Sequence, residues 1–288
     1  MKLGLALAGG GVKGAAHVGV LKVLEEENIK IDYIAGTSSG SIVATLYAVG
    51  FTADEIYEIF KKYCKKIKYV DFLYIIKVIA GLIFTGKLKI DGLNSGKQIE
   101  KLINKMCNKK EIQNISQINK SLVVPSVNMQ NGEVVCFTSS QLRNNFSDNT
   151  VFINDVNIGK AVRASCSYPG IFAPCPYEDI KLIDGGIREN VPWKELKLLG
   201  ADEVINITFE TELDTKCCDN LVEVAGRAIN LLCRELSNYE IEGADYNIKI
   251  KSNKIGLLNM KKIDELYKLG YEEMKRNIKL IRNIKEFN

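Results

Sequence analysis

The sequence predicts an α/β fold, a three-layer sandwich in which helices cover both faces of a largely parallel central sheet. Two observations predict it. A strand, a glycine-rich turn and a helix follow one another twice within residues 2–49, and short apolar strands keep alternating with helical segments afterwards. This alternation is typical of parallel strands joined by helices, with functional sites at the carboxyl ends of the strands. At 288 residues, the chain is expected to form a single domain over residues 1–288.

The first two units carry the clearest pattern. Residues 2–8 form an apolar strand, residues 9–14 form a glycine-rich turn, and residues 15–28 place apolar side chains at helical spacing. Residues 31–35 form a second apolar strand, and helix formers continue over residues 39–49 after another glycine-containing turn. We therefore expect two special turns, each at the carboxyl end of a strand.

The later elements continue the alternation. Further helices are predicted over residues 54–84, 92–110, 221–240 and 261–287. Further strands are predicted over residues 121–128, 133–138, 180–183, 204–209 and 246–250. Asn131-Gly132, between two of these strands, is a strong hairpin signal. The helices after residue 221 are expected to belong to the same domain or to form a small extension of it.

The composition indicates a folded protein. Hydrophobic residues make up 46% of the chain and charged residues 26%, close to the averages of globular domains, and the net charge of +4 does not indicate a nucleic-acid partner. No stretch reaches the roughly 18 apolar residues of a membrane span, and the apolar run over residues 3–7 is too short for a secretion signal. We expect a cytoplasmic protein, with peripheral membrane contact left open.

The eight cysteines are scattered along the chain without C-x-x-C pairs. Without a secretion signal, free and mostly buried thiols are expected rather than a disulfide framework. The adjacent pair Cys217 and Cys218 leaves a redox or metal-binding role open, although no histidine lies beside it. No metal and no cofactor are expected.

The positive charge is concentrated in one segment, residues 61–89. It holds eight lysines against one acid, Asp71, and the lysines surround an apolar run over residues 72–84. A helix of that length spans about 20 Å, which is too short for a bilayer core of about 30 Å. A basic apolar helix suits contact with an anionic lipid surface, or a lid over an active site. A buried core helix with its lysines exposed is the competing interpretation.

The turn Gly36-Thr37-Ser38-Ser39-Gly40 fits the pattern G-x-S-x-G, with a strand before it and a helix after it. That context is what a nucleophile elbow requires, because the serine occupies a strained turn whose flanking glycines relieve crowding. Any strand-to-helix turn rich in glycine and serine matches the pattern by chance. The context favours Ser38 as a nucleophile.

The loop Gly9-Gly10-Gly11-Val12-Lys13-Gly14 allows two interpretations. Gly9, Gly11 and Gly14 fit the dinucleotide fingerprint G-x-G-x-x-G, but the acid about 20 residues on, Asp32, lies at the wrong end of its strand. The alternative is an oxyanion hole, in which backbone N–H groups at a helix N-terminus bind a negative oxygen. Lys13 is then either a solvated residue at the helix start or a residue that holds the loop in shape.

The single histidine, His17, limits the choice of base. The hydrolase order Ser, Asp, His needs a histidine after Ser38, and the subtilisin order needs an acid before His17. Neither exists. The chymotrypsin order His, Asp, Ser would require Asp32 or a glutamate among residues 25–27, on or beside a helix that leads away from the site, so His17 is interpreted as a helix-packing residue. A carboxylate on a glycine-lined turn after a strand is the other option, and Asp184-Gly185-Gly186 has that form. An ordinary turn aspartate also has that form.

Taken together, these three motifs resemble those of the patatin-like phospholipases in order and context. Further segments carry the resemblance, which covers roughly residues 3–210: Ala164-Ser165-Cys166-Ser167-Tyr168-Pro169-Gly170-Ile171-Phe172, Asn190-Val191-Pro192 and Leu199-Gly200-Ala201. One departure is Lys13, where the family more often has arginine. The planar guanidinium fork is absent there, which puts any bidentate role in doubt.

The resemblance implies a patatin-like fold and a lipid acyl hydrolase of the phospholipase, lysophospholipase or esterase type. It implies that Ser38 is the nucleophile, Asp184 the base of a Ser-Asp dyad, and Gly9 to Gly11 the oxyanion loop, extending to Gly14. A phospholipid or another acyl-ester lipid is the expected partner. A nucleotide-binding oxidoreductase and a non-catalytic lipid-binding protein remain as alternatives. A histidine base should lose activity near pH 6.5, whereas an aspartate base should hold it lower unless its pKa is raised.

Overall fold

The computed structural model describes residues 1–63, 71, 74, 76, 91–141, 149–210, 221–252 and 255–286. The strands are β1 (Leu3–Leu7), β2 (Tyr33–Gly36), β3 (Ser121–Asn128), β4 (Val134–Thr138), β5 (Thr150–Ile153), β6 (Cys175–Tyr177), β7 (Ile180–Asp184), β8 (Glu203–Glu210) and β9 (Tyr246–Lys251). The helices are α1 (Gly14–Glu26), α2 (Ser39–Ala48), α3 (Ala53–Tyr63), α5 (Lys97–Cys107), α6 (Ile158–Ser165), α7 (Trp193–Leu199), α8 (Leu221–Glu240) and α9 (Ile263–Glu286). Short 3₁₀ helices cover Gly11–Lys13, Asn108–Lys110, Ile115–Gln117, Gly185–Ile187 and Met260–Lys262.

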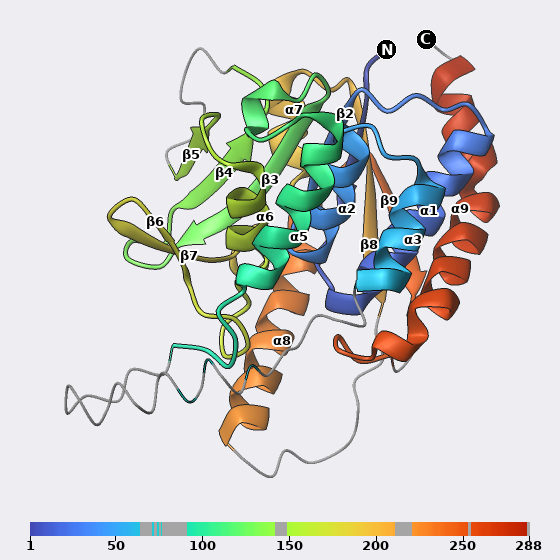
Figure 1. The fold of residues 1–288 in the computed structure, drawn as a ribbon. Helices are drawn as coiled ribbons and strands as arrows, with labels where there is room; N and C mark the ends of the chain where they lie inside the picture. Colours follow the sequence, from blue (N-terminus) through green and yellow to red (C-terminus); the bar gives the residue numbers. More distant parts are fainter. Residues whose placement is uncertain are drawn as a thin grey trace.

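The strands form one mixed sheet (Figure 1). Its order is β5-β4-β3-β2-β1-β8-β9, and a β6–β7 hairpin branches off β3. The pairs β2–β1, β1–β8, β8–β9, β2–β3 and β4–β5 are parallel, whereas β3–β4, β3–β7 and β6–β7 are antiparallel. The central strands are therefore parallel, as predicted, and the antiparallel pairs lie on one side of β2.

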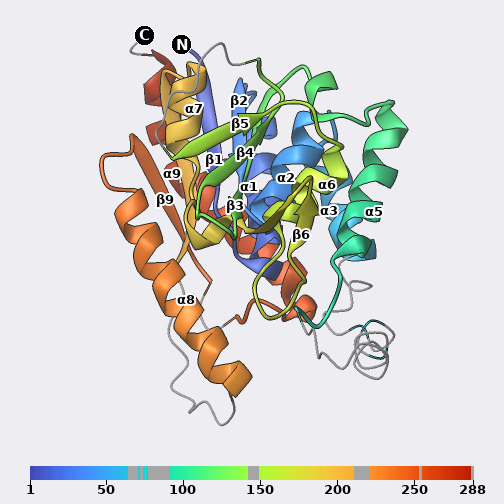
Figure 2. The same cartoon turned by 90° about the vertical axis from the view of Figure 1, so that its left-hand side faces the viewer.

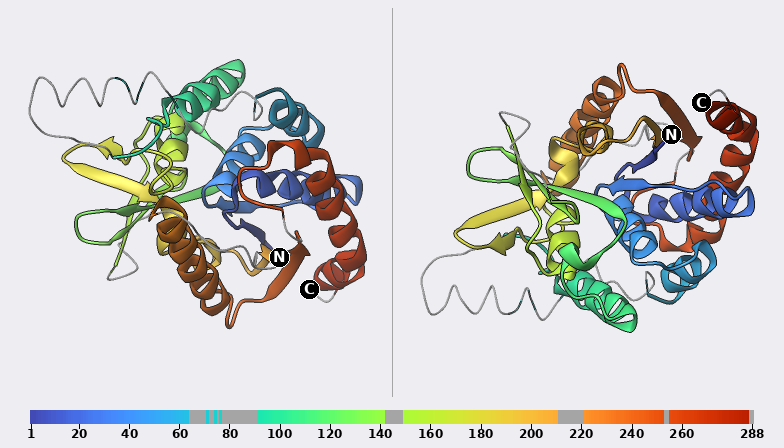
Figure 3. Two further views of the ribbon diagram at one scale, coloured as in Figure 1. Left: turned by 90° about the horizontal axis from the view of Figure 1, so that it is seen from below. Right: turned by 90° about the horizontal axis from the view of Figure 1, so that it is seen from above.

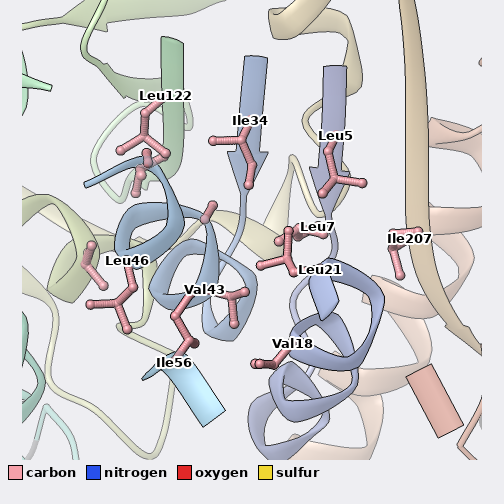
Figure 4. Close-up of a cluster of buried hydrophobic side chains, with 14 of the residues drawn as sticks. Leu5, Leu7, Val18, Leu21, Ile34, Val43, Leu46, Ile56, Leu122 and Ile207 are labelled. Atoms are coloured by element: carbon pink, nitrogen blue, oxygen red, sulfur yellow. The ribbon is translucent and has the colours of Figure 1, made fainter. Parts of the chain in front are cut away.

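Side chains of β1 show how the sheet is covered on both faces. Leu3, Leu5 and Leu7 belong to the large core cluster, whereas Ala6 and Ala8 belong to the smaller cluster on the other face. Figure 4 shows leucine, isoleucine and valine side chains of β1, β2, β3, β8, α1, α2 and α3 meeting in the large cluster. Each large aliphatic side chain buried in this way contributes about 1.5–3 kcal/mol to folding. The small alanines leave room for α7 on the opposite face.

The helices lie in two layers. Helices α1, α2, α3, α5 and α6 cover one face, and α7 and α8 lie on the other side (Figure 2). Views along the vertical axis show α5 and α8 on opposite sides of the sheet (Figure 3). The C-terminal part joins the same architecture, because β9 pairs with β8 and α9 packs along α1.

The structure confirms most predicted elements and corrects several. The Asn131-Gly132 hairpin, the two strand–turn–helix units, and the strands and helices after residue 200 are present, with shifts of a few residues at their ends. The helix predicted over residues 92–110 begins only at Lys97, because Leu93 and Asn94 run alongside residues 171–173. β5, α6 and β6 were not predicted as elements. Of α7, only the C-terminus was indicated, because Leu198, Gly200 and Ala201 are typical of a helix end, and α7 ends at Leu199 with Gly200 as its cap. The helix predicted over residues 54–84 is observed up to Tyr63.

Most of the basic segment 61–89, including the apolar run 72–84, lies outside the described residues. Within the described residues, no helix combines the length and apolar character needed to cross a bilayer. The five cysteines that the structure describes carry free thiols, and four of them are buried, as predicted: Cys107, Cys136, Cys166 and Cys175. Cys64, Cys217 and Cys218 lie outside the described residues.

Candidate active site

The three predicted motifs meet at one cavity of about 450 Å³. Seven of the predicted site residues line it: Gly9, Gly10, Gly11, Lys13, Ser38, Asp184 and Gly186. The other predicted site residues do not line it. Gly14, Gly36, Gly40 and Gly185 pack closely against neighbouring residues, and Val12 lines a smaller cavity that Ser38 also lines. Residues about 150 positions apart in the chain are thus brought to one place.

Ser38 occupies a strained turn between β2 and α2. Its backbone angles are φ 51° and ψ −120°, in a region that non-glycine residues rarely adopt. Gly36 and Gly40 allow the tight turn, because a Cβ atom on Gly36 would lie 2.3 Å from the Gly40 carbonyl oxygen, and one on Gly40 would lie 2.3 Å from that of Leu7. A strained turn between a strand and a helix is what a nucleophile elbow requires.

Two hydrogen bonds hold the elbow in place. The Ser38 amide donates to Ser165 Oγ at 3.0 Å, and Thr37 Oγ1 donates to the Glu189 carbonyl at 2.8 Å. Ser165 ends α6, and Glu189 follows the turn after Asp184. The elbow is therefore fixed by the two segments that flank β7.

Strand β3 brings Asp184 to the elbow. Its first residues pair with β2, and its last residues pair with β7, where Ser126 is opposite Asp184. The aspartate therefore arrives on an antiparallel strand of a side branch, and not on a parallel strand of the main sheet. Asp184 is the last residue of its strand, as predicted, although the pairing of that strand with β3 is antiparallel.

Asp184 is 2% exposed, and its two carboxylate oxygens differ in their hydrogen bonds. Oδ1 accepts the Gly186 amide at 2.9 Å, whereas Oδ2 has no hydrogen-bond partner within the described part of the chain. Burial raises the pKa of Asp184 from 3.8 to about 7, and the Ser38 hydroxyl and the Gly186 amide oppose this rise only in part. A carboxyl group with this pKa can accept and return a proton near neutral pH.

The glycine loop offers fewer free amides than the sequence suggested. The Gly9 amide donates to Asn190 Oδ1 at 3.0 Å, the Val12 amide to the Leu257 carbonyl at 2.8 Å and the Lys13 amide to the Gly10 carbonyl at 3.2 Å. The amides of Gly10 and Gly11 have no acceptor among the residues that the structure describes. Both residues line the cavity. Gly11 has φ +59°, which favours glycine there.

His17 lies inside the protein and is no part of this cavity. It is fully buried, its Nε2 donates to the Ala8 carbonyl at 2.8 Å, and its ring packs against Phe209 at 4.8 Å between centroids. Burial lowers the pKa of His17 to about 4. The interpretation of His17 as a helix-packing residue is consistent with each of these contacts.

The positions of Lys13 and Asp32 bear on the two interpretations of the glycine loop, a dinucleotide site and an oxyanion hole. Lys13 is 4% exposed, so the interpretation as a solvated lysine was wrong. Asp32 lies just before β2, where it accepts the Leu3 amide at 3.2 Å and pairs with Lys30 at 2.8 Å. That end of β2 is opposite to the glycine loop, and Asp32 does not line the cavity. Asp32 is therefore not placed to serve as the acid of a dinucleotide site.

Asn190 has a structural role that sequence reasoning missed. Its Oδ1 accepts the Gly9 amide, its Nδ2 donates to Ser237 Oγ at 2.8 Å, and its own amide donates to Glu240 at 2.9 Å. Ser237 and Glu240 both belong to α8. The helix therefore holds the glycine loop through one asparagine. The available signals were its position shortly after Asp184 and its place in the segment Asn190-Val191-Pro192, which carries part of the family resemblance.

The described residues hold no group of three or more histidine, cysteine, aspartate or glutamate side chains that could bind a metal ion.

Comparisons with known proteins agree on one family. The model of the family described as patatin-like phospholipase matches residues 5–197. The protein named lysophospholipase NTE1 of Meyerozyma guilliermondii is 29% identical over 206 residues, which cover 71% of this chain and 12% of that protein. YqhO of Bacillus subtilis, an uncharacterized protein, is 30% identical over 231 residues, which cover 76% of each chain. The chain thus spans about one eighth of the length of the NTE1 protein.

Solved structures agree on the fold. VipD from Legionella pneumophila superposes with a TM-score of 0.52 and 17% identity, covering 96% of this chain and 66% of that one. Human GIVD cytosolic phospholipase A2 superposes with a TM-score of 0.50 and 11% identity, covering 97% of this chain and 59% of that one. At these identities the likeness concerns the fold alone.

Proposed function

Because this chain belongs to the patatin-like phospholipase family, we propose that it is a serine hydrolase that cleaves carboxylic ester bonds of acyl lipids. One observation carries the proposal. Ser38, on a strained turn, and the buried Asp184, whose pKa is raised to about 7, line the same cavity. Nucleophilic catalysis needs a serine beside a group that can take its proton, and Asp184 is the titratable group that fits.

In the proposed mechanism, Ser38 Oγ attacks the ester carbonyl while its proton moves to Asp184. The carbonyl oxygen becomes negative and is stabilised by the amides of Gly10 and Gly11, each worth about 3 kcal/mol in sites of this kind. The alcohol leaves with the proton from Asp184, and the acyl group stays on Ser38. A water molecule then attacks the acyl ester and gives a proton to Asp184. As the bond between the acyl carbon and Ser38 Oγ breaks, Asp184 passes this proton to Ser38 Oγ, so the fatty acid leaves and both groups regain their starting state.

The substrate class follows from the relatives and from the cavity. NTE1 is named a lysophospholipase, and apolar side chains beside Ser38 offer space for an acyl chain. We propose a lipid with at least one fatty acyl ester as the substrate. No metal and no cofactor enter the proposed chemistry.

Covalent labelling tests the proposal. Human GIVD cytosolic phospholipase A2 has a structure in complex with methyl γ-linolenyl fluorophosphonate, and a fluorophosphonate should likewise modify this chain. We expect stoichiometric labelling, mapped by mass spectrometry to Ser38, together with release of fatty acid from an octanoyl lysophospholipid. Labelling at another serine would reassign the nucleophile. Lipid binding without labelling and without turnover would favour a non-catalytic lipid-binding protein.

Asn190→Ala should lower kcat about tenfold with little change in KM. The variant removes the acceptor of the Gly9 amide, and a broken buried hydrogen bond costs about 1–3 kcal/mol. The loop that carries the proposed oxyanion donors would then lose its fixed position, which affects the transition state more than the bound ester. Steady-state assays with an octanoyl ester measure the split between kcat and KM.

Ser237→Ala is the matched control for Asn190→Ala. It removes the partner of Asn190 Nδ2 and leaves the bond from Gly9 to Asn190 Oδ1 intact. We expect its kcat to stay within about threefold of the wild-type value, since the acceptor that fixes the Gly9 amide is retained. Equal loss in both variants would indicate a general loosening of α8 instead of a specific role of Asn190.

A further inference from the structure

The segment 165–167, at the C-terminal end of α6, contacts both members of the proposed dyad. Ser165 Oγ accepts the Ser38 amide at 3.0 Å, and the Ser167 carbonyl accepts the Asp184 amide at 3.1 Å. Ser38 lies on the turn after β2, and Asp184 ends β7, so the two residues reach the site on different strands. One short segment therefore binds the backbone of both.

The backbone of Ser38 is held on both sides. Its amide donates to Ser165 Oγ, and its carbonyl accepts the Ser41 hydroxyl at 2.6 Å. Ser41 belongs to α2, the helix that begins directly after the elbow, whereas Ser165 belongs to α6. The hydrogen bond to Ser165 therefore connects the elbow to a separate part of the fold.

This connection matters because the Ser38 turn is strained. A residue with φ 51° and ψ −120° keeps such a conformation only where the surrounding contacts impose it. Ser165 is fully buried, and its replacement by a residue without a side-chain acceptor would leave the Ser38 amide without its partner. The turn is then expected to relax toward a more common backbone conformation.

Helix α6 is a firm support for the elbow. Its Arg163 is 6% exposed and pairs with Glu100 of α5 at 3.1 Å, and the Gly159 amide donates to Asn104 Oδ1 at 3.0 Å. A Cβ atom on Gly159 would lie 2.5 Å from the Glu100 carbonyl oxygen, so the two helices pack at close range. The position of Ser165 is therefore set by the packing of α6 on α5.

Ser165 lines neither of the two cavities that Ser38 lines. An ester bound in these cavities therefore does not touch Ser165, and the effect of this residue on the reaction must pass through Ser38. The bond to Ser165 also occupies the Ser38 amide, which leaves the amides of Gly10 and Gly11 as the proposed oxyanion donors.

We propose that Ser165 is a positioning residue of the reaction. Its hydroxyl fixes the backbone of Ser38 while the Ser167 carbonyl fixes that of Asp184, so the segment 165–167 sets the distance over which the proton moves between them. This inference rests on the proposed ester hydrolysis and adds the residue that aligns its dyad. A misplacement of about 1 Å in such a geometry costs about 100-fold in rate.

Ser165→Ala tests the inference. We expect kcat for an octanoyl ester to fall about 10- to 100-fold, with KM within about threefold of wild type, because Ser165 is no part of the cavity walls. The rate of fluorophosphonate labelling at Ser38, measured per folded molecule, should fall in parallel. Ser165→Cys, which keeps a weak acceptor, should lie between Ser165→Ala and wild type. A wild-type kcat and labelling rate in Ser165→Ala would overturn the inference.

Ser167→Ala is the matched control. Ser167 is also fully buried, but its hydroxyl donates to the Arg163 carbonyl of the preceding helical turn at 2.9 Å, and its own carbonyl still accepts the Asp184 amide after the substitution. Each variant removes one buried hydrogen bond, so the two should lose similar amounts of melting temperature. We expect kcat of Ser167→Ala to stay within about threefold of wild type. Equal loss of kcat in both variants would indicate a general loosening of the segment and would overturn the inference.

The remaining outcomes separate the inference from the proposed hydrolysis. If the wild type cleaves the ester and Ser165→Ala does so equally well, the positioning role is wrong and the hydrolase assignment stands. If the wild type neither cleaves an ester nor reacts with a fluorophosphonate, the hydrolase assignment fails. Crystal structures then decide the positioning role alone: a Ser38 turn displaced in Ser165→Ala but not in Ser167→Ala supports it, and the same turn in both overturns it. If Ser165→Ala does not unfold cooperatively, Ser165→Cys takes its place in each comparison.

Discussion

Replacing Ser38 with alanine is expected to lower kcat for ester hydrolysis by about 10⁴- to 10⁶-fold, the range found when a catalytic serine is removed. The alanine lacks the oxygen that would form the acyl-enzyme. The fold should persist, because Ser38 donates its backbone amide, not its side chain, to Ser165. Fatty-acid release and fluorophosphonate labelling, measured on the folded variant, check the result.

Ser39→Ala provides the control from the neighbouring position. The Ser39 hydroxyl is buried without a hydrogen-bond partner within the described residues, so its removal breaks no bond. We expect its kcat and its labelling at Ser38 to remain within about twofold of wild type, because the loss of one unpaired hydroxyl leaves no other polar group unsatisfied. Turnover that survives in Ser38→Ala and disappears in Ser39→Ala would mean that the nucleophile was assigned to the wrong serine.

Asp184→Asn is expected to reduce kcat by about 10²- to 10⁴-fold, the usual contribution of a general base. The same variant should be more stable than the wild type at pH 8. The folded pKa of Asp184 is raised from 3.8 to about 7, so its stabilising contribution is complete below pH 4 and is lost as the pH rises to 7. Above pH 7 the wild type buries a charge, at a cost of about 4 kcal/mol, and the asparagine does not.

Thermal unfolding at two pH values checks this prediction. The melting temperature of Asp184→Asn should exceed that of the wild type at pH 8, and the difference should shrink toward pH 4, where the wild-type carboxyl group is protonated. A variant that is inactive and also less stable at both pH values would point to damage of the turn. In that case the loss of activity would say nothing about a base.

The pH at which the wild type loses kcat/KM on the acid side should distinguish an aspartate base from a histidine base. Free histidine titrates near 6.5 and free aspartate near 3.9. In this protein the order is reversed, because the pKa of Asp184 is about 7 and that of His17 is about 4. An acid limb of kcat/KM near pH 7 therefore supports Asp184, and His17→Gln, which keeps a donor toward the Ala8 carbonyl, should leave the limb unchanged. A limb near pH 4 that His17→Gln abolishes would contradict the dyad.

Local patterns made much of this molecule predictable. The strand–turn–helix units around Gly9 and Ser38 were visible because an apolar strand, a glycine turn and a helix are each specified by neighbouring residues. The presence of a single histidine argued against a Ser-His-Asp triad. His17 precedes Ser38, which excludes the hydrolase order, and it has no acid before it, which excludes the subtilisin order. The raised pKa of Asp184 could not be predicted, since it depends on burial by residues far away in the chain.

The unpredicted parts arise from long-range packing. Asn190 contacts Gly9 across 181 positions, and nothing near Asn190 in the sequence specifies that partner. Helix α6 was missed although Asn157 caps its N-terminus by accepting the Lys160 amide, because such an asparagine also favours turns. Arg227 and Arg234, which line the cavity from α8, were predictable as one helix face, but the surface opposite them was not.

Helix α8 lies beyond residue 197, where the match to the family model ends, and yet it forms one wall of the cavity. The residues proposed for catalysis would then lie before residue 197, and part of the wall that contacts the substrate would lie after it. Recombination after the segment for α7 could exchange the wall and keep the nucleophile and the base, and it would keep the glycine loop in place where the new helix supplies the contacts to Asn190 that Ser237 and Glu240 make here. Chimeras that join residues 1–210 to the corresponding C-terminal segment of a relative are thus a direct route to new substrate preferences.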